Sequence, residues 1–180
     1  SFYLALNKKT MTILLTNDDG VNAEGIQSLF NVLSTEHEVF VVAPEDERSA
    51  CSNAITVRTS LSMRQLDDRH FAVDGYTADC VNIGLNGGFI PPVDLVISGI
   101  NHGPNLGDDV YFSGTVAGAR TACIFGIHGI AVSLDCLASS SYFNQVSEFI
   151  KHFISDIMRF RGRPAIFFNI NYPNLPADEI

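Results

Sequence analysis

The chain has 180 residues, of which 46% are hydrophobic, and this length favours one domain with a single substantial core. Acidic residues outnumber basic residues by 20 to 11, which gives a formal net charge of −9 at pH 7. A field of this sign repels nucleic acid and anionic membranes, so a long polyanion-binding groove is excluded as the expected function. A small phosphorylated substrate stays compatible with the charge, because a bound cation or oriented backbone amides can reverse the field locally.

The N-terminal segment and the cysteines favour a cytoplasmic protein. Residues 2–6 are apolar but too few for the hydrophobic part of a secretion signal, and no apolar stretch approaches the ~20 residues that span a bilayer. Because Met11 directly precedes the first convincing strand, residues 1–10 are interpreted as a tag or upstream extension. The four cysteines have no close metal-binding spacing, so reduced thiols are the simpler interpretation.

Along the chain, apolar runs rich in β-branched residues alternate with segments whose apolar residues recur at three- and four-residue spacing. The runs predict strands, and the spaced segments predict helices. In chain order these are strand 12–16, helix 25–34, strand 39–43, helix 78–85, strand 94–98, helix 115–125, strand 130–134, helix 143–159 and strand 165–170. The alternation predicts an α/β fold, Rossmann-like with three α/β/α layers and a mostly parallel sheet, over residues 11–180.

One segment departs from the alternation. Residues 55–66 and 70–73 are predicted to form a short antiparallel pair, a β-hairpin or flap insertion, joined at Asp67 and Asp68.

Polar residues gather directly after the predicted strands, where an open α/β sheet binds its ligands. Asp18 and Asp19 follow the first strand, Ser49 lies in the loop after the second, and Asn101 follows the third parallel strand. Two adjacent carboxylates beside a buried strand repel each other, so a cation is expected to keep both ionised. Their oxygens, with the Ser49 hydroxyl and the Asn101 amide, suit magnesium or manganese. The alternative is that either aspartate caps a helix or supports the turn before Gly20.

A second polar segment precedes the predicted helix 115–125. Ser113, Gly114 and Thr115 would place free amides and hydroxyls at the start of that helix, where they can hold an anion. The alternative is an ordinary N-cap formed by Ser or Thr. The preceding loop contains Gly103, Pro104 and Gly107, which is typical of a shaped ligand loop.

Taken together, these loops resemble the SurE survival-protein family of nucleotidases. The resemblance is carried by residues 13–20 (ILLTNDDG), 42–44 (VAP) with Arg48 and Ser49, 96–101 (VISGIN), 103–109 (GPNLGDD), 113–116 (SGTV) and 131–134 (AVSL), with a weaker echo at 169–176. It implies a metal-dependent phosphomonoesterase acting on nucleoside 5′-monophosphates, with 3′-nucleotidase and short-chain polyphosphatase side activities.

The resemblance also implies roles and partners. Asp18, Asp19, Ser49 and Asn101 would bind one divalent ion per subunit, Mn²⁺ or Mg²⁺, while Asn105 and Ser113-Gly114-Thr115 would line the phosphate pocket. Asp18 or Asp19 would accept a proton from the attacking water or would itself attack. Family members form homodimers or homotetramers, partly through a β-rich C-terminal oligomerisation extension that we expect this chain to lack.

Two other phosphate-handling classes fit less well. Phosphatases of the haloacid-dehalogenase type have two aspartates separated by one residue, whereas Asp18 and Asp19 are adjacent. A phospho-receiver signalling module needs a phospho-accepting Asp after its third strand and a Lys after its fifth. The third and fourth candidate parallel strands here are followed by Gly99-Ile100-Asn101 and Asp135-Cys136.

Overall fold

The computed structural model describes residues 10–136 and 142–180, so the prediction for residues 1–10 lies, apart from Thr10, outside the described part. Its strands are β1 (Thr12–Thr16), β2 (Glu38–Pro44), β3 (Met63–Gln65), β4 (His70–Val73), β5 (Leu95–His102), β6 (His128–Asp135) and β7 (Phe167–Pro173). Its α-helices are α1 (Glu24–Leu33), α2 (Thr77–Asn86), α3 (Asp109–Phe112), α4 (Gly114–Ile124) and α5 (Phe143–Ile157), and η1 (Met158–Phe160) and η2 (Ala177–Glu179) are short 3₁₀ turns.

The strands form one sheet in the order β3-β4-β2-β1-β5-β6-β7, and every neighbouring pair except β3 and β4 is parallel. The predicted mostly parallel α/β fold is therefore confirmed. Within the described residues, no helix combines the length and apolar character that crossing a membrane requires.

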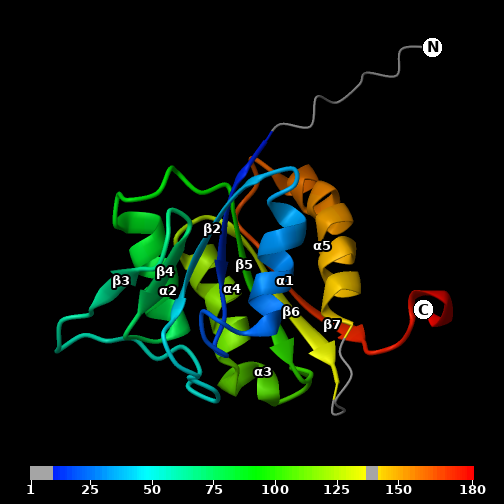
Figure 1. Ribbon diagram of the computed structural model, residues 1–180, viewed down its shortest axis with the longest axis horizontal. Coiled ribbons are helices and arrows are strands. Elements are labelled where there is room, and N and C mark those ends of the chain that lie inside the picture. The colour runs from blue at the N-terminus through cyan, green and yellow to red at the C-terminus, as the bar shows by residue number, and fades with distance from the viewer. Residues whose placement is uncertain (1–9, 137–141) are drawn as a thin grey trace.

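Both faces of the sheet are covered by helices, which makes three layers. In Figure 1, α1 and α5 lie side by side on one face, while α2 and α4 lie on the other. Residues of β1 alternate between the two cores: Ile13 and Leu15 pack in the cluster that includes α1 and α5, and Leu14 packs in the cluster that includes α2. All three are fully buried, and each contributes about 1.5–3 kcal/mol through removal from water. This two-sided burial explains why β1 is continuously apolar.

The helices form where the sequence spaces its apolar residues helically. In α1, Ile26, Leu29 and Leu33 follow one another at three and four residues, and all three are fully buried against the sheet. In α5, the buried residues Val146, Ile150 and Ile154 recur at four-residue spacing. The predicted helix 143–159 ends two residues early as an α-helix, because its last turn tightens into η1.

The predicted hairpin insertion is present, but its extent was wrong. Only Met63–Gln65 of the predicted segment 55–66 is a strand, and it pairs antiparallel with β4. β4 in turn pairs in parallel with β2, so the hairpin extends the main sheet instead of standing apart as a flap. The preceding residues are held otherwise, since the buried Asp79 carboxylate accepts hydrogen bonds from the Thr56 backbone N–H and hydroxyl.

The strand order reverses at β1. After β1 the chain builds outwards through β2 and β4, and it then returns to add β5, β6 and β7 on the other side. Loops leaving the carboxyl ends of β1 and β5 therefore diverge and open a crevice between them, which is where doubly wound sheets bind ligands. In Figure 1 the loop after β2 and helix α3 lie at this same end of the sheet.

Candidate metal and phosphate site

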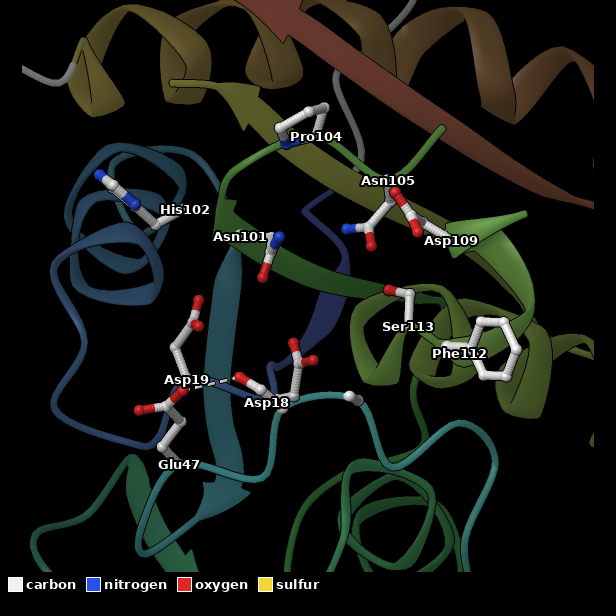
Figure 2. Close-up of a pocket in the computed structure, with 12 residues that line it drawn as sticks. Asp18, Asp19, Glu47, Asn101, His102, Pro104, Asn105, Asp109, Phe112 and Ser113 are labelled. Atoms are coloured by element: carbon white, nitrogen blue, oxygen red, sulfur yellow. Dashed lines mark hydrogen bonds between the residues drawn. The ribbon is translucent and has the colours of Figure 1, made fainter. Parts of the chain in front are cut away.

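A pocket of about 490 Å³ lies in this crevice (Figure 2). Its lining is strongly acidic and includes no Lys or Arg among the described residues. The lining residues are Asp18, Asp19, Glu47, Ser49, Ala50, Asn101, His102, Pro104, Asn105, Asp109, Phe112 and Ser113. The structure thus gathers loops that the sequence separates by up to 95 residues.

The turn after β1 fixes the two aspartates. The Asn17 side chain donates to the Gly20 carbonyl at 2.8 Å and accepts from the Gly20 N–H at 3.2 Å, which closes the turn. The Arg48 backbone N–H donates to the Asp18 carbonyl at 2.7 Å and ties this turn to the loop after β2. These hydrogen bonds therefore fix the backbone of the strand end from which both acidic side chains project.

Asp18 is almost fully buried, with 4% of its surface exposed. Its Oδ1 accepts a hydrogen bond from the Thr115 hydroxyl, and the backbone amides of Gly114 and Thr115 also donate to the carboxylate. Burial raises the pKa of Asp18 above its ordinary value, and these hydrogen bonds oppose the rise. The amino end of α4 thus partly offsets the cost of a buried carboxylate, as expected for a helix N-terminus.

Gly114 is required at its position by this contact. A Cβ built on Gly114 would lie 2.7 Å from the Asp18 Cβ and 2.8 Å from its Oδ2, closer than side-chain atoms can approach. Only glycine lets α4 begin directly against the carboxylate.

Asp19 is less buried and projects into the pocket (Figure 2). Burial raises the pKa of its carboxyl to about 7, and the neighbouring negative charge of Asp18 adds to the rise. A hydrogen bond from the His102 backbone N–H acts in the opposite direction, while Glu47 adds a further upward push. A bound cation would therefore stabilise the ionised forms of both Asp18 and Asp19.

Ser49 and Asn101 lie at the same pocket but make local bonds. The Ser49 hydroxyl donates to Glu47 Oε1 at 2.8 Å on the exposed loop. Asn101 donates from Nδ2 to the Gly103 carbonyl at 2.8 Å, and Figure 2 shows its amide oxygen pointing towards the two aspartates. Asn101 therefore presents its acceptor to the pocket as the sequence predicts. The roles of both residues as metal ligands stay predictions.

The predicted phosphate-binding segment divides in two. Ser113 lines the pocket and also caps α4, because its Oγ accepts from the Val116 N–H at 3.0 Å. The N-cap alternative is thus confirmed for Ser113, and its hydroxyl proton stays available to a ligand, so the predicted phosphate role is compatible with it. Gly114 and Thr115, by contrast, are packed on Asp18 and are absent from the pocket lining. Gly114 and Thr115 therefore orient the Asp18 carboxylate and do not face the pocket.

Asn105 is buried, with 7% of its surface exposed, and lines the pocket as predicted. Sequence reasoning gave no role to Glu47, Asp109 and Phe112, which also line it. Asp109 and Phe112 belong to α3, whose four residues are too few to show a helical pattern in sequence. For His102 the sequence leaves open a phosphate contact, an acid near the metal and an ordinary loop histidine; in the structure its backbone N–H donates to Asp19.

Comparison with known proteins decides the family. A family model described as survival protein SurE matches residues 13–180. The chain belongs to the SurE family. Its SurE relatives include proteins named 5′-nucleotidase SurE from Leptospira interrogans, 42% identical over 91% of this chain, and from Pelobacter propionicus, 45% identical over 94% of it. A crystal structure of the SurE protein from Aquifex aeolicus matches with a TM-score of 0.86 and 37% identity, covering 94% of this chain and 68% of that one.

The matched region is only part of these SurE relatives. The chain spans 65% of the length of the Leptospira protein and 69% of the Pelobacter protein.

The metal-free protein is expected to lose stability as pH rises from about 5 to about 8. The folded-state pKa of Asp19 is about 7 against an ordinary value of 3.8, so in this window the folded state binds more protons than the unfolded state. The contribution of Asp19 to stability is therefore largest near the unfolded-state pKa of 3.8, and it is lost as pH rises through the folded-state pKa of about 7. Asp19→Asn removes this titration. Between about pH 5 and about pH 8 the Tm of the variant should therefore fall less than the Tm of the wild type, and the two falls should differ by on the order of 5 °C.

Thermal unfolding of chelator-treated wild type and Asp19→Asn at matched pH values measures this difference. Asp18 keeps titrating in the variant, since its pKa is raised independently by burial, so a smaller fall is expected but not a flat profile. Equal falls in Tm for the two proteins would contradict the raised pKa of Asp19.

Proposed function

We propose that this chain carries the catalytic site of a divalent-metal-dependent phosphatase that hydrolyses nucleoside 5′-monophosphates to nucleoside and phosphate. The names of the Leptospira and Pelobacter relatives, 5′-nucleotidase SurE, support the substrate class. Nucleoside 3′-monophosphates and short polyphosphate are proposed as further substrates, because each presents the same terminal phosphoryl group.

The acidic lining of the pocket is the observation that carries the metal dependence. Asp18, Asp19, Glu47 and Asp109 line it, and no described Lys or Arg joins them. A phosphate dianion would be repelled by such a surface, so its binding here requires a cation between the phosphate and the carboxylates. Hydrolysis without metal is not compatible with these charges.

The donor chemistry fits a hard divalent ion. Two carboxylates with the Asn101 amide oxygen and the Ser49 hydroxyl offer only oxygen, which suits Mg²⁺ or Mn²⁺ better than zinc. Within the described residues, no three His, Cys, Asp or Glu side chains are arranged so that they could hold a metal ion together, so a site here depends on the neutral oxygens as well. We propose one such ion per subunit, held by Asp18, Asp19, Ser49 and Asn101.

Ser113 and Asn105 are the proposed hydrogen-bond donors to the transferring phosphoryl group. A bound divalent ion supplies Lewis-acid polarisation and neutralises charge on the transferring group. Ser113 can donate its hydroxyl proton to a phosphoryl oxygen, and Asn105 can donate from Nδ2, so both stabilise charge that develops in the transition state. These two residues lie across the pocket from the aspartates (Figure 2).

Asp19 is the proposed acceptor of the proton from the attacking water. Asp18 Oδ1 is already bonded to Thr115 and the residue is 4% exposed, which suits a fixed ligand. Asp19 is more accessible and projects into the pocket, so one of its oxygens can reach a water molecule there (Figure 2).

Removal of metal tests the proposal. After chelator treatment, the protein is expected to release phosphate from AMP at less than about 1% of the rate seen with Mn²⁺ or Mg²⁺, since several kcal/mol of transition-state stabilisation is lost. Phosphate release is measured across nucleoside 5′- and 3′-monophosphates and tripolyphosphate, with ribose 5-phosphate as the base-free comparison. Undiminished release without metal would refute the metal role, and no release from any nucleotide with metal would refute the nucleotidase.

The remaining expectations are also proposals. We propose residues 11–180 as one domain, a cytoplasmic location and assembly as a homodimer or homotetramer. Support comes from the spacing of the four cysteines, which indicates reduced thiols, from the net charge of −9, which disfavours anionic membranes, and from the resemblance to the family.

A further inference from the structure

The loop that carries Asn105 has little secondary structure to hold it. It leaves β5 and runs through Gly103 and Gly107, which both adopt positive φ, before α3 begins at Asp109. Asn105 is nevertheless 7% exposed, so its backbone N–H and C=O must find partners inside the protein. Neither group can join the sheet at this point, because β5 has already ended.

Two asparagines on the edge strand β7 supply those partners. The Asn105 N–H donates to Asn171 Oδ1 at 2.7 Å, and Asn171 Nδ2 donates back to the Asn105 carbonyl at 3.1 Å. Asn169 Nδ2 donates to the same carbonyl at 2.9 Å. The loop that carries Asn105 therefore extends from β5 past β6 to β7, since β7 pairs with β6 and not with β5.

The Asn105 side chain is held separately. Its Nδ2 donates to Ser133 Oγ at 2.8 Å, and Ser133 lies on β6 opposite Asn171. One Nδ2 hydrogen is therefore occupied and the other is left to face the pocket, into which Figure 2 shows the amide projecting. The orientation of this donor is set by strands far from it in sequence.

The chemistry of the partners is specific. Asn105 offers one donor and one acceptor from its backbone, and a side-chain amide supplies an acceptor and a donor side by side without charge. A carboxylate at Asn171 would repel the Asn105 carbonyl and also add negative charge beside an already acidic pocket. A hydroxyl is too short to bond both groups at once.

We propose that Asn169 and Asn171, together with Ser133, are positioning residues for phosphate binding, which they serve by holding Asn105 in its donating orientation. We call these three residues the Asn105 clamp. The inference rests on the proposed phosphatase function, because Asn105 acts as a phosphate donor only there. The clamp residues act through Asn105 and make no contact with the phosphate themselves.

A double-mutant cycle tests the clamp. The inhibition constant of inorganic phosphate is measured during metal-dependent AMP hydrolysis in wild type, Asn171→Ala, Asn105→Ala and the double variant. Asn171→Ala is expected to raise this constant about tenfold in the wild-type background, because a hydrogen bond to a charged group is lost. In the Asn105→Ala background, the same change should alter it less than about twofold, since the residue through which it acts is gone.

Tyr172→Phe is the matched control. Tyr172 lies on the same strand as Asn171 and packs against the core cluster that includes α1 and α5. Its hydroxyl accepts one hydrogen bond from Gln145 Nε2 at 3.1 Å. Removal of the Tyr172 hydroxyl should leave the phosphate inhibition constant within about twofold of the wild-type value. Asn169→Ala and Ser133→Ala, which each remove a single bond to Asn105, keep the test open if Asn171→Ala does not fold.

The outcomes separate the clamp from the proposed function. An equal rise in the inhibition constant on Asn171→Ala in both backgrounds, in an active enzyme, would overturn the clamp and leave the phosphatase standing. No metal-dependent phosphate release by the wild type would overturn the proposed function and the clamp with it.

Discussion

Replacing Asp18 with Asn is expected to lower kcat/KM for metal-dependent phosphate release by on the order of 10³-fold. The change keeps the size of the side chain, and its Oδ1 can still accept from Thr115, so folding should be preserved. What is lost is one negative charge in the lining of the pocket, where Asp18 would be a ligand of the proposed divalent ion. The loss should affect kcat as well as KM, because charge stabilisation grows in the transition state.

Two measurements check this expectation. Phosphate release from AMP gives kcat/KM, and titration calorimetry gives the dissociation constant for Mn²⁺, which should rise in the variant. Asp68→Asn, an identical chemical change at an exposed residue between β3 and β4, serves as the control and should leave both unchanged. If Asp18→Asn kept more than about a tenth of the wild-type activity, Asp18 would not be a required metal ligand.

Gly25→Ala is expected to lower Tm by at least about 5 °C, although alanine is the better helix former by about 1 kcal/mol. A Cβ on Gly25 would lie 2.1 Å from the Ile100 carbonyl oxygen and 3.0 Å from its carbonyl carbon. These are backbone atoms of β5, so they cannot rotate away as a side chain would. Helix α1 must move off the sheet, and overpacking of this kind costs about 1–3 kcal/mol or more.

Gly25→Ala should also affect the proposed metal site. Ile100 directly precedes Asn101, so a shift of the β5 backbone displaces a proposed metal ligand and should also lower kcat. Asn31→Ala, on an exposed position of the same helix, is the control and should leave Tm within about 2 °C. Wild-type stability in Gly25→Ala, measured by thermal unfolding, would show that α1 is not fixed against β5 by this contact.

The segment Ser113-Gly114-Thr115 shows why neighbouring residues need not share a role. In sequence, all three resemble a phosphate-binding helix start. In the structure only Ser113 faces the pocket, while Gly114 and Thr115 hold Asp18. Because a helix turns by about 100° per residue, consecutive side chains at its start point in different directions. The segment therefore links the proposed phosphate donor to the proposed metal ligand.

Much of the fold and part of the site could be predicted from sequence. Strands such as Thr12–Thr16 are buried on both faces, and this burial makes them continuously apolar, so they are visible without any structure. Asp18, Asp19 and Asn101 could be placed at one edge because parallel strands present their carboxyl ends together. Helix α3 could not be found, since four residues carry no period, and the hairpin was overextended because exposed strands lack a burial pattern.

The sequence by itself determined the α/β class, the family and the adjacent carboxylates of Asp18 and Asp19, because these depend on local pattern and on residue type. Only the tertiary structure decided how those residues are held. The Thr115 hydroxyl reaches Asp18 across 97 residues, and Asn171 reaches Asn105 across 66. Such contacts leave no local pattern, since either partner would be an ordinary polar residue of a helix or strand, and they become specific only when packing brings the two together.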